Sequence, residues 1–208
     1  MKALFFGIYN KNDPVNARTR ILLDGLKKRG WEVEECNTSV SSFGRFWFLL
    51  REYRKVGKDY DVMFLAYAGA QTISILAKIL SRKKIVADPI VSLYDTMVFD
   101  RKKVSRFGLK AVYYYTLDWL MCRMVDIVIA DTNANIEYFC RTFGVPASKF
   151  RRLFIGTDEK IMRPQGDKKR EGVFLVHFHG FFIPLHGVEY IVKAAKILEA
   201  ENVAFNII

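Results

Sequence analysis

Apolar and polar positions follow two periods along the chain, and these periods predict strands and helices in turn. Residues 2–9 form a brief apolar run that ends in a polar turn, and residues 17–29 then place apolar side chains at helical spacing before Gly30. This order repeats downstream. Further strands are expected at 31–36, 61–67, 84–87, 126–130 and 149–155, and further helices at 42–58, 70–80, 105–124 and 133–143.

The alternation of strands and helices predicts an α/β fold: a Rossmann-like doubly wound parallel sheet with helices on both faces. Ligands of such sheets bind at the carboxyl ends of the strands, near the point where the strand order reverses. A site is therefore expected in the loops after Tyr9, Tyr67, Ala87 and Ala130.

A polar connection over residues 156–170 separates this unit from a second one. A strand is expected at 173–178, a loop at 180–187, a helix at 188–200 and a strand from 203 to the end. One crossover helix and two strands leave most of a sheet face uncovered, so an incomplete second α/β domain is expected. We expect an N-terminal domain over 1–165 and the first β-α-β portion of a C-terminal domain over 166–208.

Composition and charge narrow the class of protein. The 208 residues are 51% hydrophobic, which excludes a disordered chain, and the net charge of +11 favours anionic partners such as phosphorylated molecules, nucleic acid or an acidic membrane surface. Three scattered cysteines suggest neither a disulfide framework nor a zinc ribbon, and a reducing cytoplasm fits. No uninterrupted run of 18 apolar residues occurs, so no transmembrane helix is expected.

Four stretches of the sequence resemble a known enzyme family. Gly180-Phe-Phe-Ile-Pro-Leu-His-Gly187 with the helix after it looks like the start of the C-terminal domain in family 4 retaining glycosyltransferases, which have the GT-B architecture. Residues 130–139, 144–149 and 155–164 resemble the end of that family's N-terminal domain. The resemblance spans the chain. It implies transfer of a hexose from a nucleotide-diphosphate sugar to a lipid-linked, polysaccharide or protein-glycan acceptor, without a cofactor or metal.

The resemblance also implies that the loop between Gly180 and Gly187 faces the donor diphosphate. In the family this loop commonly carries an arginine after the first glycine and a lysine before the second, whereas Phe181 and His186 stand there in this chain. The usual two-cation clamp is therefore in doubt, although a protonated His186 would donate to a phosphate. Ordinary turn glycines and a solvated histidine are the alternative interpretation.

The loop after the first strand provides candidates on the acceptor side. It lacks G-x-G-x-x-G, which argues against a dinucleotide cofactor and against an epimerase or reductase. Asn10, Asn12 and Asn16 are suited to sugar hydroxyls, and Arg18 to a phosphate. Helix capping by Asp13 or Asn16, with a solvated Arg18, has equal weight.

The loop after the fourth strand contains two further candidates for acceptor contacts, Asp88 and Asp95. A carboxylate in a turn or N-cap is the alternative for both. No catalytic residue is assigned, because retaining transfer is usually described as a front-face displacement in which the donor phosphate takes the acceptor proton. His177 and His179 share a strand face, but no acidic residue or cysteine completes a familiar spacing, so no metal is expected.

The helix over 42–58 combines aromatic and basic residues. Phe43, Phe46, Trp47, Leu50 and Tyr53 are expected on one face. Docking of this face on an anionic membrane would favour a lipid-linked acceptor, and burial in the N-terminal domain is the alternative.

Glycosyl transfer is the leading hypothesis, for a cytoplasmic protein that also associates peripherally with membranes. A non-catalytic Rossmann-like binding module, such as a basic nucleic-acid or membrane-surface binder, is the alternative. No nucleic-acid partner is expected, because the basic residues lie on helices and linkers without an interleaved aromatic groove. The chain alone is expected to be inactive, because the family's nucleotide-recognition residues lie further along.

Overall fold

The computed structural model describes residues 1–208 except 11–15, 40–41, 43, 68, 158–161 and 163–171. Its larger sheet is entirely parallel and has the strand order β2-β1-β3-β4-β5-β6. Because β2 lies on one side of β1 and β3 on the other, the strand order reverses between β1 and β3. The strands are β1 (Lys2–Ile8), β2 (Glu32–Thr38), β3 (Val62–Leu65), β4 (Lys84–Ile90), β5 (Ile127–Ala130) and β6 (Phe150–Arg152).

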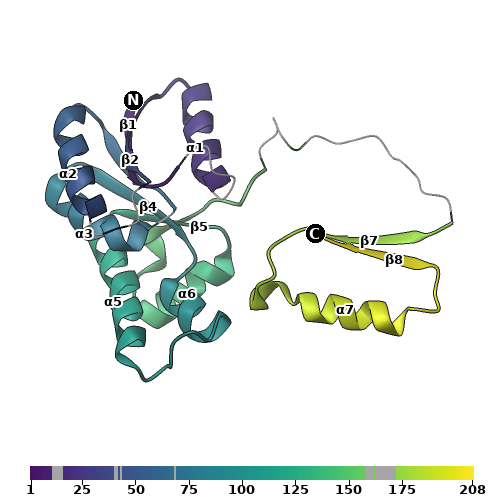
Figure 1. Cartoon of the computed structure of the whole chain (residues 1–208). Helices are drawn as coiled ribbons and strands as arrows, with labels where there is room; N and C mark the ends of the chain where they lie inside the picture. Colours follow the sequence, from purple (N-terminus) through teal and green to yellow (C-terminus); the bar gives the residue numbers. More distant parts are fainter. Residues whose placement is uncertain (11–15, 40–41, 43, 68, 158–161, 163–171) are drawn as a thin grey trace.

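Helices cover both faces of this sheet, and its four central strands, β1, β3, β4 and β5, are mostly buried between them (Figure 1). Leu4 and Phe6 of β1 belong to the core beneath α2, α3, α5 and α6, whereas Phe5 packs with Leu23 of α1 on the other face. The predicted doubly wound α/β fold is confirmed. The helices are α1 (Ala17–Lys28), α2 (Gly44–Val56), α3 (Ala70–Leu80), α5 (Leu109–Met124) and α6 (Asn133–Phe143).

The region between β4 and α5 differs from the prediction. The strand continues to Ile90, and a short helix α4 (Leu93–Asp95) leads directly into a π-helical turn, η2 (Thr96–Asp100), which the pattern did not predict. Helix α5 begins at Leu109 because a turn closed by Gly108 N and Ser105 O, 3.0 Å apart, precedes it. A 3-10 turn, η3 (Ala147–Lys149), precedes β6, which is short because its partner β5 is short.

The buried face of α2 is rotated from the predicted one. Leu49 is completely buried and Phe46 packs against the core, whereas Trp47 is 74% exposed. Leu50 is half-buried, and Phe43 lies outside the described residues. The prediction is right for Phe46 and Tyr53, which is buried in the core, and wrong for Trp47. Sequence spacing leaves the direction of the core undefined when nearly every position of a turn is apolar.

The second unit contains a parallel pair of strands, β7 (Phe174–Phe178) and β8 (Val203–Ile207), joined through η4 (Pro184–His186) and helix α7 (Val188–Ile197). The predicted order of strand, loop, helix and strand is present. None of the described residues from 172 onward is buried. Within the described parts of both units, no helix is long and apolar enough to cross a bilayer.

Candidate functional site

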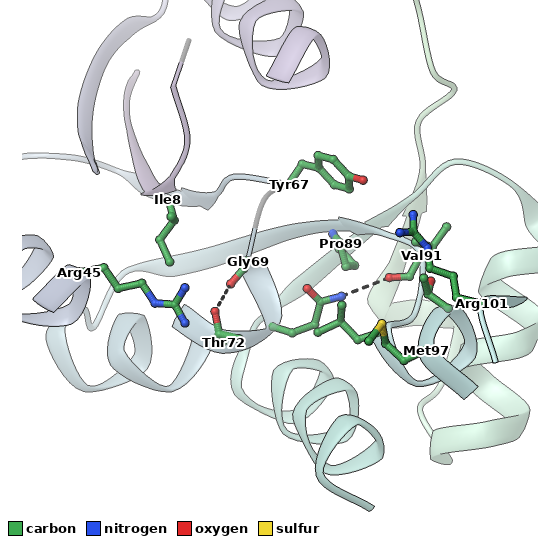
Figure 2. A pocket seen from close by; sticks show the side chains of 12 residues that line it. Ile8, Arg45, Tyr67, Gly69, Thr72, Pro89, Val91, Met97 and Arg101 are labelled. Carbon is green, nitrogen blue, oxygen red and sulfur yellow. Dashed lines mark hydrogen bonds between the residues drawn. The ribbon is translucent and has the colours of Figure 1, made fainter. Parts of the chain in front are cut away.

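A pocket of about 550 Å³ opens at the carboxyl ends of β1, β3 and β4, where the strand order reverses (Figure 2). This is the sheet edge at which the sequence predicts a site, and two of the four predicted loops, those after Tyr67 and Ala87, contribute described residues to it. None of the described acceptor-side candidates taken from the sequence lines it. The lining residues are Ile8, Arg45, Tyr67, Gly69, Gln71, Thr72, Pro89, Val91, Leu93, Thr96, Met97 and Arg101.

An unusual backbone turn at the end of β4 shapes one wall of this pocket. Ile90 has a φ of +59°, which is rare for a β-branched residue, and Val91 N donates to Pro89 O over 2.7 Å around it. The pairing of β4 with β5 shifts register at this point. The turn places Pro89 and Val91 on the pocket, and Gln71 Nε2 donates to Val91 O over 3.2 Å.

A buried carboxylate on α5, that of Asp118, holds the start of α4, which forms the next part of the pocket wall. Asp118 is fully buried and accepts hydrogen bonds from Ser92 Oγ at 2.7 Å, Leu93 N at 3.2 Å and Tyr94 N at 2.9 Å. Burial raises the pKa of Asp118 to about 6, although these donors oppose the shift. Asp118 thereby positions the start of α4. Sequence reasoning missed this role; the signal was a lone carboxylate inside an apolar helical stretch.

The pocket is positively charged. Figure 2 shows Arg45 on one side of it and Arg101 on the other, and among the described lining residues there is no aspartate or glutamate. The buried Nε of Arg45 has no hydrogen-bond partner within the described part of the chain. Between the two guanidinium groups the lining is mostly apolar. The pocket is therefore suited to a ligand that carries both an anionic group and apolar surface.

Arg18 and Asp88 form a buried ion pair beside this edge of the sheet. Arg18 Nε donates to Asp88 Oδ2 over 2.7 Å, and the other guanidinium nitrogens reach Leu153 O at 3.3 Å and Phe154 O at 3.5 Å. Burial raises the pKa of Asp88, against the opposing effect of Arg18. Neither side chain is solvated, in contrast to the alternative interpretation of Arg18. The pair ties α1 to β4 and to the chain after β6.

Two buried oxygens lie next to this pair without an identified partner. Asp88 Oδ1 and Asn16 Oδ1 accept no hydrogen bond from the described residues, while Asn16 Nδ2 donates to Asn10 O over 3.1 Å. Asn16 therefore precedes α1 without a side-chain cap. Asn12 lies outside the described residues. Free buried acceptors of this kind are suited to the hydroxyl donors of a sugar.

Asp95 ends α4 and belongs to a local turn. Its backbone N donates to Ser92 Oγ over 3.0 Å, so Ser92 caps this helix. Burial raises the pKa of the Asp95 carboxyl, and the nearby Asp100 adds to the shift. Its neighbour Thr96 lines the pocket, but Asp95 does not. The structure thus brings Asp95 near the pocket wall rather than into the pocket.

The loop from Gly180 to Gly187 lies at the carboxyl end of β7 and leads into α7. Gly187 has a φ of +57° and Gly180 has little room for a side chain, since an added Cβ would lie 3.0 Å from the Phe178 ring. Phe181 is 69% exposed. His186 Nδ1 lies 2.6 Å from Phe181 O, and because a carbonyl only accepts, this nitrogen carries a proton.

The three histidines of the second unit do not form a metal cluster. His177 and His179 are exposed, and His186 is bound to the Phe181 carbonyl. Over the described residues of the whole chain, no group of three or more histidines, cysteines and acidic residues is placed to hold a metal ion.

Comparisons with known proteins agree on the fold. No protein-family model and no curated protein matches the sequence. Among solved structures, Alr3699/HepE of Anabaena is similar in complex with UDP and glucose (TM-score 0.58, 16% identity), with UDP (0.54, 16%) and with UDP-glucose (0.53, 15%). Each match covers 99% of this chain and 68% of the other. At this identity the similarity establishes a shared Rossmann-like α/β fold.

Proposed function

We propose that this protein is a glycosyltransferase of the GT-B architecture that transfers a sugar from a nucleotide-diphosphate sugar. One observation carries the proposal: the fold matches UDP- and UDP-glucose-bound structures over 99% of the chain. The pocket at the switch point supports it, because doubly wound sheets bind their ligands there. The family resemblance adds a retaining mechanism and division into domains near residue 165.

The switch-point pocket is the proposed acceptor site. Arg45 and Arg101 attract an anionic group, and no carboxylate from the described part of the chain opposes it in the lining. The apolar residues between them favour a lipid portion over a fully polar glycan. A lipid-linked phosphate is therefore the acceptor class that fits this lining best. Asn10, Asn16 and Asp88 follow or lie near the carboxyl ends of β1 and β4 and are the candidates for the hydroxyls of the reacting sugars.

The loop from Gly180 to Gly187 is the proposed donor-phosphate site. Because Phe181 O holds Nδ1 of His186, a phosphate is bound through Nε2, and Nε2 carries a proton only in the imidazolium form. In the proposed front-face displacement the donor phosphate accepts the acceptor proton, so the chain supplies binding and orientation, and no cofactor or metal is required.

Calorimetric titration with UDP and UDP-glucose tests the proposal. Wild type is expected to bind UDP, and His186→Ala to bind it about ten-fold more weakly, the effect of one lost charge-assisted hydrogen bond. His177→Ala is the matched control, because His177 is also an exposed histidine of the second unit. Failure of wild type to bind either ligand would overturn the proposal. Sugar transfer by this chain alone would contradict the expectation that it is inactive by itself.

A further inference from the structure

The turn before α5 exposes aromatic and aliphatic side chains. Gly108 N donates to Ser105 O over 3.0 Å, so Arg106 and Phe107 occupy the centre of a four-residue turn. Phe107 is 91% exposed, and Leu109, the first residue of α5, is 89% exposed. Figure 1 shows the amino-terminal end of α5 and the turn before it at the lower end of the first unit.

The exposed side chains around this turn form a group that we call the α5 tip. Arg106 bridges two of its members, since its guanidinium carbon lies 5.8 Å from the Phe99 ring centre and 5.9 Å from that of Phe107. Helical spacing places the members on α5 along one face. The α5 tip comprises Phe99, Phe107, Leu109, Val112 and Tyr113, all of them exposed.

The charge around the α5 tip is of one sign. No aspartate or glutamate occurs between Asp100 and Asp118, and every lysine and arginine in that interval is exposed. By contrast, α7, which also exposes large apolar side chains, carries Glu189 among its lysines. The cations that surround the α5 tip are Arg101, Lys102, Lys103, Arg106 and Lys110.

We propose that the α5 tip docks this protein on an anionic lipid bilayer. Phe107 and Leu109 enter the interface between headgroups and acyl chains, and the surrounding cations contact anionic headgroups. Arg101 lines the switch-point pocket and belongs to the basic group of the α5 tip, so docking brings that pocket to the membrane surface. Docking itself does not depend on sugar transfer, whereas its use for a lipid-linked acceptor rests on the proposed function.

Vesicle co-sedimentation of the full chain tests the docking. Wild type is expected to bind vesicles of phosphatidylcholine with phosphatidylglycerol, and to bind more weakly in high salt and on pure phosphatidylcholine. F107S/L109S should lower the partition coefficient at least about ten-fold. Because both side chains are exposed, its melting temperature should match that of wild type. Phe107→Trp should show a blue shift of fluorescence on vesicle addition that exceeds the wild-type shift.

Two variants serve as controls, because they remove exposed apolar side chains that lie outside the α5 tip. Trp47→Ser removes the most exposed aromatic side chain of α2, and Ile79→Ser an aliphatic one on α3, and both are expected to bind vesicles as wild type does. Loss of binding in Trp47→Ser with F107S/L109S unaffected would place docking on α2 and overturn the proposal. Absence of vesicle binding by wild type would also overturn the proposal. Binding of nucleic acid by the same residues would not rescue it.

Discussion

Helices α3 and α7 are of similar length and both connect two parallel strands, yet only α3 is buried. Ile73, Ser74 and Ala77 of α3 are completely buried between the larger sheet and α5, whereas no described residue of α7 is buried. An amphipathic pattern is therefore sufficient for the local motif in both units. Burial requires neighbouring strands and helices on both sides, and among the described residues only the larger unit has them.

This difference in burial separates polar side chains that act on stability from those that act on binding. In the larger unit Arg18, Asp88 and Asp118 are desolvated and hold elements together, so their substitution acts first on stability. In the second unit His186 is exposed, so its substitution is expected to act on binding alone. Paired substitutions in the two units test this division.

The largest effect is expected from truncating the same aromatic side chain in both units. Phe139 is completely buried against Phe143 and Phe150, so Phe139→Ala should cost about 3–5 kcal/mol of unfolding free energy. Phe174 on β7 is 71% exposed, and Phe174→Ala should cost less than about 1 kcal/mol. Urea denaturation measures both. Similar losses for the two variants would contradict the comparison.

An intermediate effect concerns the pH dependence of stability. Burial raises the pKa of folded Asp118 to about 6 from an ordinary value of 3.8, so the folded state retains this proton to a higher pH than the unfolded state. The resulting stabilisation is complete below pH 3.8 and is lost as the pH rises through 6, up to about 3 kcal/mol.

Asp118→Asn should therefore remove this part of the pH dependence, as measured by urea denaturation at several pH values from 4 to 7. The raised pKa values of Asp88 and Asp95 also contribute to the pH dependence of stability. Because they do so in wild type and variant alike, the difference between the two proteins isolates Asp118. An unchanged slope of unfolding free energy against pH in Asp118→Asn would show that Asp118 does not carry the effect. Asp118 would then no longer be an example of a buried group of the larger unit that acts on stability.

The smallest effects are expected at two glycines of the larger unit. A Cβ on Gly7 of β1 would lie 2.8 Å from Ala66 Cβ and 3.4 Å from Ala66 N, so Gly7→Ala should cost about 1–3 kcal/mol. Gly25 in α1 has no atom within 4 Å of an added Cβ, and Gly25→Ala should stabilise by about 1 kcal/mol. Thermal denaturation shows whether each variant is more or less stable than wild type. Stabilisation by both substitutions would show that backbone entropy outweighs packing at Gly7.

Local patterns were enough to predict the order of the strands and of the longer helices, and the fold class. Residues 70–80 and 133–143 were expected as helices, and α3 and α6 have those bounds. Helix α6 is bounded by the cap from Thr132 Oγ1 and by Gly144 at a φ of +63°, signals that lie within a few residues of its ends. Parallel packing followed from the alternation of strands and helices, and with it the edge of the sheet that holds the pocket.

The identity of the pocket residues depended on contacts between distant parts of the chain. Arg18 pairs with Asp88, 70 positions away, and Asp118 on α5 holds Ser92 and Leu93. Asp88, a candidate site residue from the sequence, is buried in its pair with Arg18, and its neighbours Pro89 and Val91 line the pocket. Periodicity defines which residues share a face, whereas the packing of distant elements decides whether that face meets a core, a ligand or solvent.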